Sequence, residues 1–185
     1  MPLVSRQGAI GALLIAAAST AVAGSFQLTS STIKPNAKLA EAQVFDGFGC
    51  SGKNISPALK WSGAPAGTRS YAVTVYDPDA PGSGWWHWVV YNIPGSASEI
   101  PQGAGGAGGK GLPSGSVQGR TDFGAPGYGG ACPPQGDKPH RYIFTVHALK
   151  VDKLDVSPDS PPAQVGRMID ANRLDKASLT ATYSR

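Results

Sequence analysis

Clusters of basic residues are absent from this sequence. Its 185 residues include 16 Lys and Arg against 12 Asp and Glu, scattered along the chain without a run of one sign. A surface that binds nucleic acid needs a basic patch or stripe. Because the formal net charge is only +4, we expect no nucleic-acid partner and only weak long-range attraction to polyanions.

Metal-ligating and nucleotide-binding motifs are also missing. The three His residues form no H-E-x-x-H, and the two Cys residues form no C-x-x-C, so we expect no zinc site. Gly103, Gly105 and Gly108 fit G-x-G-x-x-G, but a dinucleotide site requires a helix after the motif. The Gly-rich residues 95–119 offer none. We interpret them as a surface loop and predict no cofactor.

The longest apolar run is too short to cross a membrane. It covers residues 8–18, after Arg6 and before Ala21-Val22-Ala23, which is the pattern of a signal peptide with its cleavage site. A membrane-spanning helix needs about 20 apolar residues. We therefore predict that residues 1–23 are a signal peptide. Residues 24–185 are expected to form one periplasmic or secreted domain with no integral membrane segment.

Residues 70–94 combine two strand-forming runs, 71–76 and 86–93, with a loop rich in Asp, Pro and Gly between them. Asp77 and Asp79 begin this loop, and Trp85 and His87 stand where the chain re-enters the sheet. These four side chains are expected at one rim of the sheet. Asp-Pro-Asp is also a good turn former, and a Trp-rich strand is commonly core, so a purely structural role stays open.

Residues 127–149 repeat this arrangement, because a loop rich in Gly and Pro leads to His140 and then to a strand. Two such loops suggest one shared pocket. Strand alternation places Tyr142 on the same face as His140 and puts His147 on the opposite face. We assign His147 to packing.

The number of short strands with Gly and Pro turns, together with one clear helix, predicts a mainly β sandwich. Both faces of 71–76 are apolar, so this strand should be central in its sheet. Ser160 as N-cap and Pro161 as first helical residue should begin a helix of about three turns. Residues 177–183 alternate and should form a last strand.

Several long strings of this sequence resemble those of the phosphatidylethanolamine-binding protein family, also called Raf kinase inhibitor-like, and its bacterial YbhB/YbcL branch. The resemblance covers nearly all of the chain after residue 24, and it implies two packed antiparallel sheets of Greek-key type, one or two short helices and an anion pocket at one end. The matching strings are KNISPALKWSGAP, DPDAP, GSGWWHWVVYNIP, GRTDFG, GACPP and HRYIFTVHAL.

The resemblance also implies a ligand site. The positions that match the family's pocket or its rim are Asp77, Asp79, His87, Gly130, Pro133, Pro134, His140 and Tyr142, and Trp85 stands beside them. In physical terms, imidazoles would donate to a small anion, the Gly-rich backbone at residues 129–132 would form a nest of N–H groups, and aromatic and Pro faces would line the wall. The Ala80-Pro81 bond is a candidate cis peptide in this loop.

Cys50 and Cys132 are the two cysteines of a chain that we expect to be exported, and an even count in an oxidising compartment predicts a disulfide. Their Cα atoms should then lie about 4.4–6.8 Å apart. A reactive thiol at Cys132 is the alternative. The rim cysteine is not general to the family, so the rim geometry is expected to differ here.

Two functions of different class fit these residues. The first is a non-catalytic binding or inhibitor-like protein, monomer or homodimer, whose pocket takes a small anion or phosphate head group and whose biological target is a protein or lipid. The alternative is a hydrolase of a phosphoester or similar small substrate that uses Asp77 or Asp79 with His87 or His140 as an acid–base pair. No nucleophile elbow accompanies that pair. For the binding function we expect tighter binding at lower pH, because the Asp residues should raise the pKa of both imidazoles.

Overall fold

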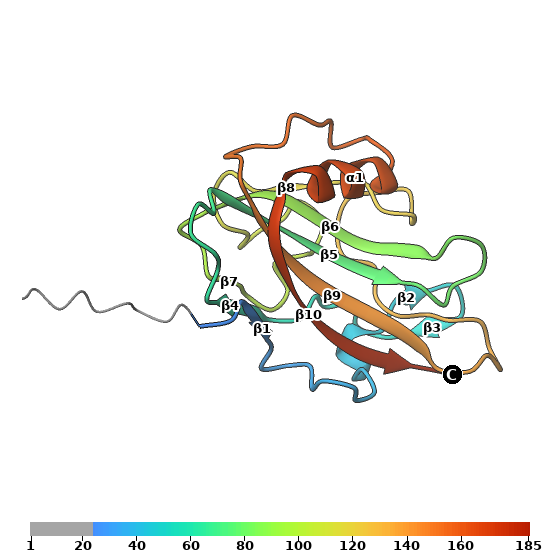
Figure 1. Cartoon of the computed structure of the whole chain (residues 1–185). Helices are drawn as coiled ribbons and strands as arrows, with labels where there is room; N and C mark the ends of the chain where they lie inside the picture. Colours follow the sequence, from blue (N-terminus) through green and yellow to red (C-terminus); the bar gives the residue numbers. More distant parts are fainter. Residues whose placement is uncertain (1–23) are drawn as a thin grey trace, which may run out of the picture.

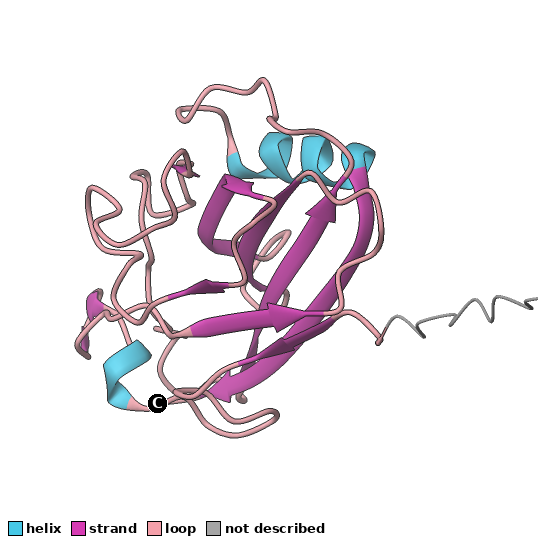
Figure 2. Cartoon of the chain, turned by 90° about the vertical axis from the view of Figure 1, so that its left-hand side faces the viewer, coloured by secondary structure: helices cyan, strands magenta, loops and turns pink. Residues whose placement is uncertain are grey.

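The computed structural model describes residues 24–185, and the predicted signal peptide lies outside this part of the chain. The strands form a five-stranded antiparallel sheet, a three-stranded antiparallel sheet and a small hairpin. One α-helix, α1 (Pro162–Asn172), covers the outer face of the large sheet (Figures 1 and 2). The fold is therefore the expected mainly β sandwich, with a helix on the outside.

The large sheet has the strand order β10-β9-β5-β6-β8. Its middle strand is the predicted central one, and seven of its eight residues are buried because both faces are covered. The strands are β5 (Ser70–Asp77), β6 (Trp85–Pro94), β8 (Val117–Gln118), β9 (His140–Leu149) and β10 (Arg173–Tyr183).

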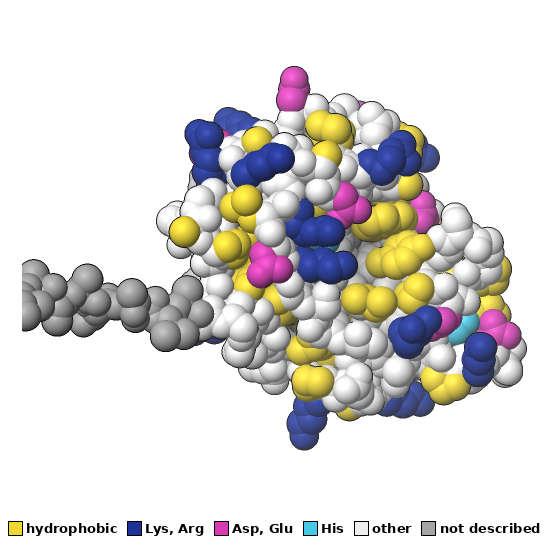
Figure 3. Space-filling model, viewed as in Figure 1, with side chains coloured by type: hydrophobic (Ala, Val, Ile, Leu, Met, Phe, Trp, Pro, Cys, Tyr) yellow, Lys and Arg dark blue, Asp and Glu magenta, His cyan; other side chains and the backbone are white. Residues whose placement is uncertain are grey.

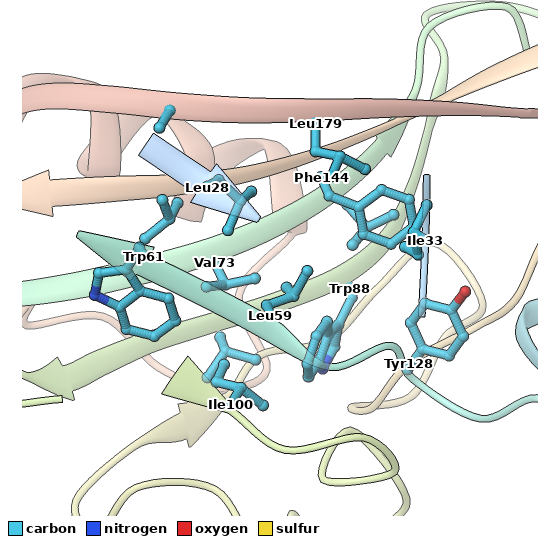
Figure 4. Close-up of a cluster of buried hydrophobic side chains, with 14 of the residues drawn as sticks. Leu28, Ile33, Leu59, Trp61, Val73, Trp88, Ile100, Tyr128, Phe144 and Leu179 are labelled. Atoms are coloured by element: carbon cyan, nitrogen blue, oxygen red, sulfur yellow. The ribbon is translucent and has the colours of Figure 1, made fainter. Parts of the chain in front are cut away.

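The small sheet has the order β1-β4-β7 and packs against the inner face of the large sheet. Trp61 and Leu59 from its middle strand meet Val73, Trp88 and Phe144 from the large sheet in one apolar layer (Figure 4). Its strands are β1 (Gln27–Thr29), β4 (Leu59–Ser62) and β7 (Glu99–Ile100). This layer is the main core of the domain.

A second apolar cluster fixes α1 to the outer face. Val165 and Ile169 of the helix are fully buried against Ala72, Val89 and Tyr91 of the sheet. Gly166 lets the helix approach closely, because a Cβ there would lie 2.8 Å from the Trp86 ring. The helix begins one residue later than predicted: Pro161 is the N-cap, and Ser160 makes no capping bond.

The Gly-rich segment 95–119 is more ordered than a plain surface loop. It contributes β7 and β8 to the two sheets, and Ile100 and Ala104 are buried in the main core. Glycine is needed where this segment passes close to the core. At Gly105, for example, a Cβ atom would lie only 2.8 Å from the side chains of Ser56 and Trp88. The prediction of a surface loop was therefore wrong for these positions.

The remaining elements are a 3-10 helix, η1 (Glu41–Gln43), and the hairpin of β2 (Asp46–Gly47) and β3 (Cys50–Ser51). Basic side chains on the face shown in Figure 3 are scattered, as the sequence suggested. Within residues 24–185, no helix has the length and apolar character needed to cross a membrane. The Ala80-Pro81 bond is trans, because the described residues contain no cis peptide; that prediction was wrong.

Candidate functional site

The candidate site lies at one end of the large sheet, where three neighbouring strands present their termini. Asp77 is the last residue of β5, Trp85 is the first residue of β6, and the two are register partners. His140 is the first residue of β9, which runs antiparallel to β5. This end lies beside the C-terminus at the right of Figure 1. The antiparallel register thus brings the two predicted loops to one rim, as expected.

A cavity of about 190 Å³ opens at this rim. Its wall is mainly aromatic and Pro, its polar groups are the imidazoles, a carboxylate and a phenol, and it has no Lys or Arg among the residues that line it. The lining residues are Phe48, Asp77, Ala80, Pro81, Trp85, His87, Phe123, Cys132, Pro133, Pro134, His140 and Tyr142.

Asp77 and His140 form a buried pair. Oδ2 of Asp77 lies 2.8 Å from Nδ1 of His140, and both side chains are only 3% exposed. Because a carboxylate accepts, the imidazole Nδ1 donates. Oδ1 of Asp77 accepts from the backbone N–H groups of Asp79 and Ala80 at 2.8 and 3.1 Å. The Asp77 carboxylate therefore has two roles: it stabilises the turn of the Asp-Pro-Asp segment, and it orients His140 in the cavity.

The second nitrogen of His140 faces another carboxylate. Its Nε2 lies 3.5 Å from Oδ2 of Asp137, whose side chain is 48% exposed. Sequence reasoning had not included Asp137. Its position three residues before His140, in the same loop, was the available signal. An anion that binds Nε2 must therefore share it with, or displace, this carboxylate.

His87 is held in a different way. Its Nδ1 lies 2.8 Å from the backbone oxygen of Gly129, and the residue is 4% exposed. Burial lowers the pKa of His87 below its ordinary value, and the Gly129 carbonyl and the charge of Asp77 oppose that shift without reversing it. The expected upward shift was therefore wrong for His87, since desolvation outweighs the nearby carboxylate.

Tyr142 brings a hydroxyl to the same cavity. The residue is 1% exposed, and its Oη donates no hydrogen bond to any described residue, although the Cys132 backbone N–H lies close enough to oppose the rise of its pKa. Burial raises the pKa of this phenol, with a smaller contribution from Asp77. Its ring stands edge-on to the imidazole of His87, with the centroids 5.1 Å apart. A buried hydroxyl without a partner costs about 1–3 kcal/mol, and a bound ligand atom would relieve that cost.

Two phenylalanines that sequence reasoning missed form an aromatic side of the cavity. Phe123 packs edge-on against both Trp85 and His87, at 5.7 and 5.3 Å between centroids. Phe48 lies stacked on Phe45 at 5.4 Å and is 72% exposed at the mouth. Phe123 belongs to the GRTDFG string that carried the resemblance, which was a usable signal. Phe48 is brought in by the β2–β3 hairpin, where nothing in the sequence alone pointed to the pocket.

The structure places Asp79 outside the cavity lining. Its two carboxylate oxygens accept from Nε and Nη2 of Arg141 at 2.9 and 2.8 Å, and one of them also accepts from the Arg141 backbone N–H. The hydrogen bonds from Arg141 lower the pKa of Asp79 to about 2. Asp79 therefore anchors the loop to β9 instead of orienting a histidine in the pocket.

Gly130 also differs from its expected position, because the backbone N–H groups of its turn are already bonded within the protein. Gly129 donates to the His87 carbonyl at 2.8 Å, Gly130 to Oδ1 of Asn54 at 2.7 Å, and Ala131 to the Gln43 carbonyl at 3.1 Å. A Cβ at Gly130 would lie 2.4 Å from the Gln43 backbone. The expected anion nest is therefore not free, and this turn serves to position His87.

The predicted disulfide is present. Cys50 and Cys132 are bonded, with their Cα atoms 6.0 Å apart. The bond joins the β2–β3 hairpin, which carries Phe48, to the segment that contains Pro133 and Pro134. The C-terminal Arg185 reinforces this link, since it donates to the carbonyls of Pro133 and Gly49. The cavity mouth is thus tied to the core by covalent and hydrogen bonds.

His147 lies far from this rim and takes the packing role that was predicted. Its Nε2 is 3.0 Å from Oγ1 of Thr74, and the residue is 7% exposed. Burial, with the neighbouring Arg173 and Lys176, lowers the pKa of His147 to about 3. It is a neutral core histidine.

Comparison with known proteins agrees with this geometry. The family model described as phosphatidylethanolamine-binding protein matches residues 29–184. YbcL of Escherichia coli K12 is 56% identical over 165 residues, which cover 89% of this chain and 90% of YbcL. YbhB of the same organism is 50% identical over 159 residues, or 85% of this chain and 99% of YbhB.

A solved structure shows the same fold. The crystal structure of E. coli YbcL, described as a new member of the mammalian PEBP family, superposes with a TM-score of 0.86 at 55% sequence identity. The match covers 88% of this chain and 99% of that one. From the family model, the relatives and the fold together, the chain belongs to the phosphatidylethanolamine-binding protein family, in the branch of YbcL and YbhB.

Proposed function

We propose that this protein is an exported, non-catalytic binding protein whose rim cavity takes the phosphate or carboxylate group of a small ligand. The observation that carries the proposal is the pairing of an oriented imidazole, His140, with the buried and unpartnered hydroxyl of Tyr142 in one cavity. The Tyr142 hydroxyl can donate to an oxyanion, and Nε2 of His140 can do so in the imidazolium form, because Nδ1 already donates to Asp77. The aromatic wall excludes water from the bond that forms, which strengthens it.

The size and charge of the cavity define the ligand further. About 190 Å³ is below the roughly 300–1,000 Å³ of sites for drug-sized ligands. An inorganic anion or a single head group is therefore the expected occupant. Because no Lys or Arg lines the cavity, the affinity must come from hydrogen bonds at short range and not from a strong field.

Export is supported by two features. Residues 1–23 carry the signal-peptide pattern, and the Cys50–Cys132 disulfide is a bond that persists in oxidising compartments such as the bacterial periplasm. N-terminal sequencing of protein recovered from the periplasm or the medium tests this part. The expected first residue is Gly24, and a soluble protein that retains Met1 would contradict export.

A hydrolase remains the alternative, and the Asp77–His140 pair is the feature that favours it. Against it, the residues that line the cavity include no Ser, Thr, Lys or free thiol, so that only its Asp, His and Tyr side chains could act as a nucleophile. The Asp77 carboxylate already accepts three hydrogen bonds. Turnover of a chromogenic phosphomonoester by the purified protein, lost in His140→Ala, would support the hydrolase over the binding protein.

Calorimetric titration tests the binding function. Inorganic phosphate and phosphoethanolamine are titrated into the wild type and into Tyr142→Phe at pH 5.5. We expect saturable binding to the wild type, at least about fivefold weaker in Tyr142→Phe, because one hydrogen bond is worth roughly 1 kcal/mol. The absence of heat with both anions would contradict the proposal.

A further inference from the structure

The Cys50–Cys132 disulfide lies between two cavities. Cys132 lines the rim cavity, and Cys50 lines a second cavity of about 240 Å³ that is also bordered by Tyr183 and Arg185. Cys132 is partly exposed, whereas Cys50 is 8% exposed. A thiolate exchanges with a disulfide only where it can reach a sulfur. The bond is therefore accessible to a thiolate from its Cys132 side, unlike a disulfide that is packed in a core.

The segments on the two sides of the bond are also attached to each other without it. Val44, before the hairpin, forms a parallel β-bridge with Ala131 of the rim segment. Arg185 donates to the carbonyls of Pro133 and Gly49 at 2.6 and 2.9 Å, and so links the rim segment to the hairpin a second time. The disulfide can therefore open while the domain stays folded, and the two thiols then stay near each other for the bond to form again.

The bond holds a strained turn in place. Phe48 and Gly49 form the two-residue turn between the register partners Gly47 and Cys50, and both have a positive φ, of 53° and 81°. Such turns favour Asn and Gly, because a bulky side chain is strained in the left-handed region. Phe48 nevertheless occupies this position and is 72% exposed. If the bond beside this turn opened, the turn could relax, and Phe48 would move at the cavity mouth.

We propose that the Cys50–Cys132 bond is a thiol–disulfide exchange site, at which a dithiol opens the bond from the rim cavity and releases the Phe48 turn. The thiolate of the dithiol attacks Sγ of Cys132 and forms a mixed disulfide with it, and Cys50 leaves as a thiolate that takes up a proton. The second thiol of the dithiol then attacks the dithiol sulfur of the mixed disulfide and releases Cys132. The protein gains two electrons and two protons, and the dithiol is oxidised to its intramolecular disulfide.

The rate of reduction distinguishes attack on the folded protein from attack after unfolding. Reduction by dithiothreitol is measured by alkylation and mass spectrometry, in the wild type and in Ile169→Ala. This substitution lies in the α1 cluster, and it should raise the unfolded fraction roughly 30-fold or more. We expect a rate that is proportional to the dithiothreitol concentration over about a tenfold range and equal within about twofold in the two proteins. A rate that reaches a plateau, or one that rises about 30-fold in Ile169→Ala, would overturn the inference.

The attacked sulfur is identified with glutathione, a monothiol whose reaction stops at the mixed disulfide. After a short exposure and an acid quench, peptide mapping locates the adduct, and the chain has no cysteines other than these two. We expect the adduct mainly on Cys132, because this residue borders the rim cavity and is the more exposed of the pair. An adduct mainly on Cys50 would contradict the proposed route.

Heteronuclear NMR spectra of the oxidised and the reduced wild type test the release of the turn. We expect amide shifts at residues 46–51 and 131–134, with α1 unchanged and the signal dispersion of a folded domain kept. Oxidised glutathione should restore the first spectrum, because the bridge of Val44 and Ala131 keeps the two thiols close. No anion is needed for this result, so a failure of the proposed function would leave it intact. The spectrum of an unfolded chain after reduction, or shifts that spread to α1, would overturn the inference.

Discussion

The two ends of β9 carry buried histidines that do different work. His140, at the rim, donates to a carboxylate, and its second nitrogen reaches another one. His147, seven residues further on, is paired with the hydroxyl of Thr74 and surrounded by packed side chains. Both are at most 7% exposed. Burial alone therefore does not identify a ligand site. The two histidines differ in their hydrogen-bond partners, and only His140 lines the cavity.

The two ends are also stabilised differently. At the rim, loops are held by the disulfide, by Asp79 and by Arg185. Away from the rim, Val165 and Ile169 of α1 cover the outer face of the sheet in an apolar cluster with Ala72 and Leu149. Stability and binding should therefore respond separately to changes at the two ends.

The largest effect is expected from removing the disulfide. The double substitution Cys50→Ser and Cys132→Ser opens a link that spans 82 residues, which in the chain-entropy model corresponds to roughly 4–5 kcal/mol of unfolding free energy. Urea unfolding of the wild type and the variant measures it. Because Cys132 lines the cavity, phosphate affinity should fall too. A variant with unchanged stability and affinity would show that the structure of the cavity mouth does not depend on the disulfide.

A core substitution at the far end should cost stability without affecting the site. Ile169→Ala removes a side chain of α1 that is 1% exposed, and such a change costs roughly 2–5 kcal/mol. Chemical denaturation gives the loss, and calorimetry at a temperature where the variant is folded gives the affinity. We expect the phosphate affinity to stay within about twofold of the wild type. A large drop in affinity would mean that the two ends are coupled.

Removing the charge of Asp137 should tighten binding. Asp137→Asn takes away a half-exposed carboxylate 3.5 Å from Nε2 of His140, which competes with an incoming anion. For a partly screened charge we expect about a three- to fivefold gain in phosphate affinity at pH 5.5. Asp155→Asn is the matched control, since it removes the charge of an exposed carboxylate that forms no ion pair among the described residues. Weaker binding in Asp137→Asn would instead mean that Asp137 helps to hold the ligand.

The smallest effect concerns the loop anchor at Asp79. Its pKa is lowered to about 2, below the ordinary value near ~3.9. A lowered carboxyl pKa contributes stability that is present above the unfolded-state value and is lost as the pH falls through about 2. Asp79→Asn should therefore be less stable than the wild type at pH 6, and the difference should shrink as the pH falls and vanish below about 2. If the difference in unfolding free energy between the wild type and Asp79→Asn were the same at both pH values, the charge of Asp79 would not be its cause.

The sequence was most informative where side-chain chemistry repeats along a strand. Residues 71–76 are apolar on both faces, which predicted the buried central strand, and the alternation after His140 separated Tyr142 from His147. The two Asp- and Gly-rich loops were correctly expected to meet at one rim, because an antiparallel register brings such ends together.

What the sequence could not reveal depends on contacts between distant segments. Phe48 reaches the mouth only because the disulfide and Arg185 hold its hairpin there. Asp79 turns to Arg141 because of the β5–β9 register, which no local pattern specifies. The Gly129–Ala131 turn looked like a free nest, but Asn54 and Gln43 occupy its N–H groups from far along the chain.

The central claim is that the rim end of β9 binds the anion and that the far end does not. A titration of ¹⁵N-labelled protein with inorganic phosphate, followed amide by amide in heteronuclear NMR spectra, tests it most directly. We predict saturable shifts that are largest at Asp77, His87, His140 and Tyr142, with His147 and α1 unmoved. Shifts centred on the far end of the sheet, or no saturable shift at the rim, would contradict the account.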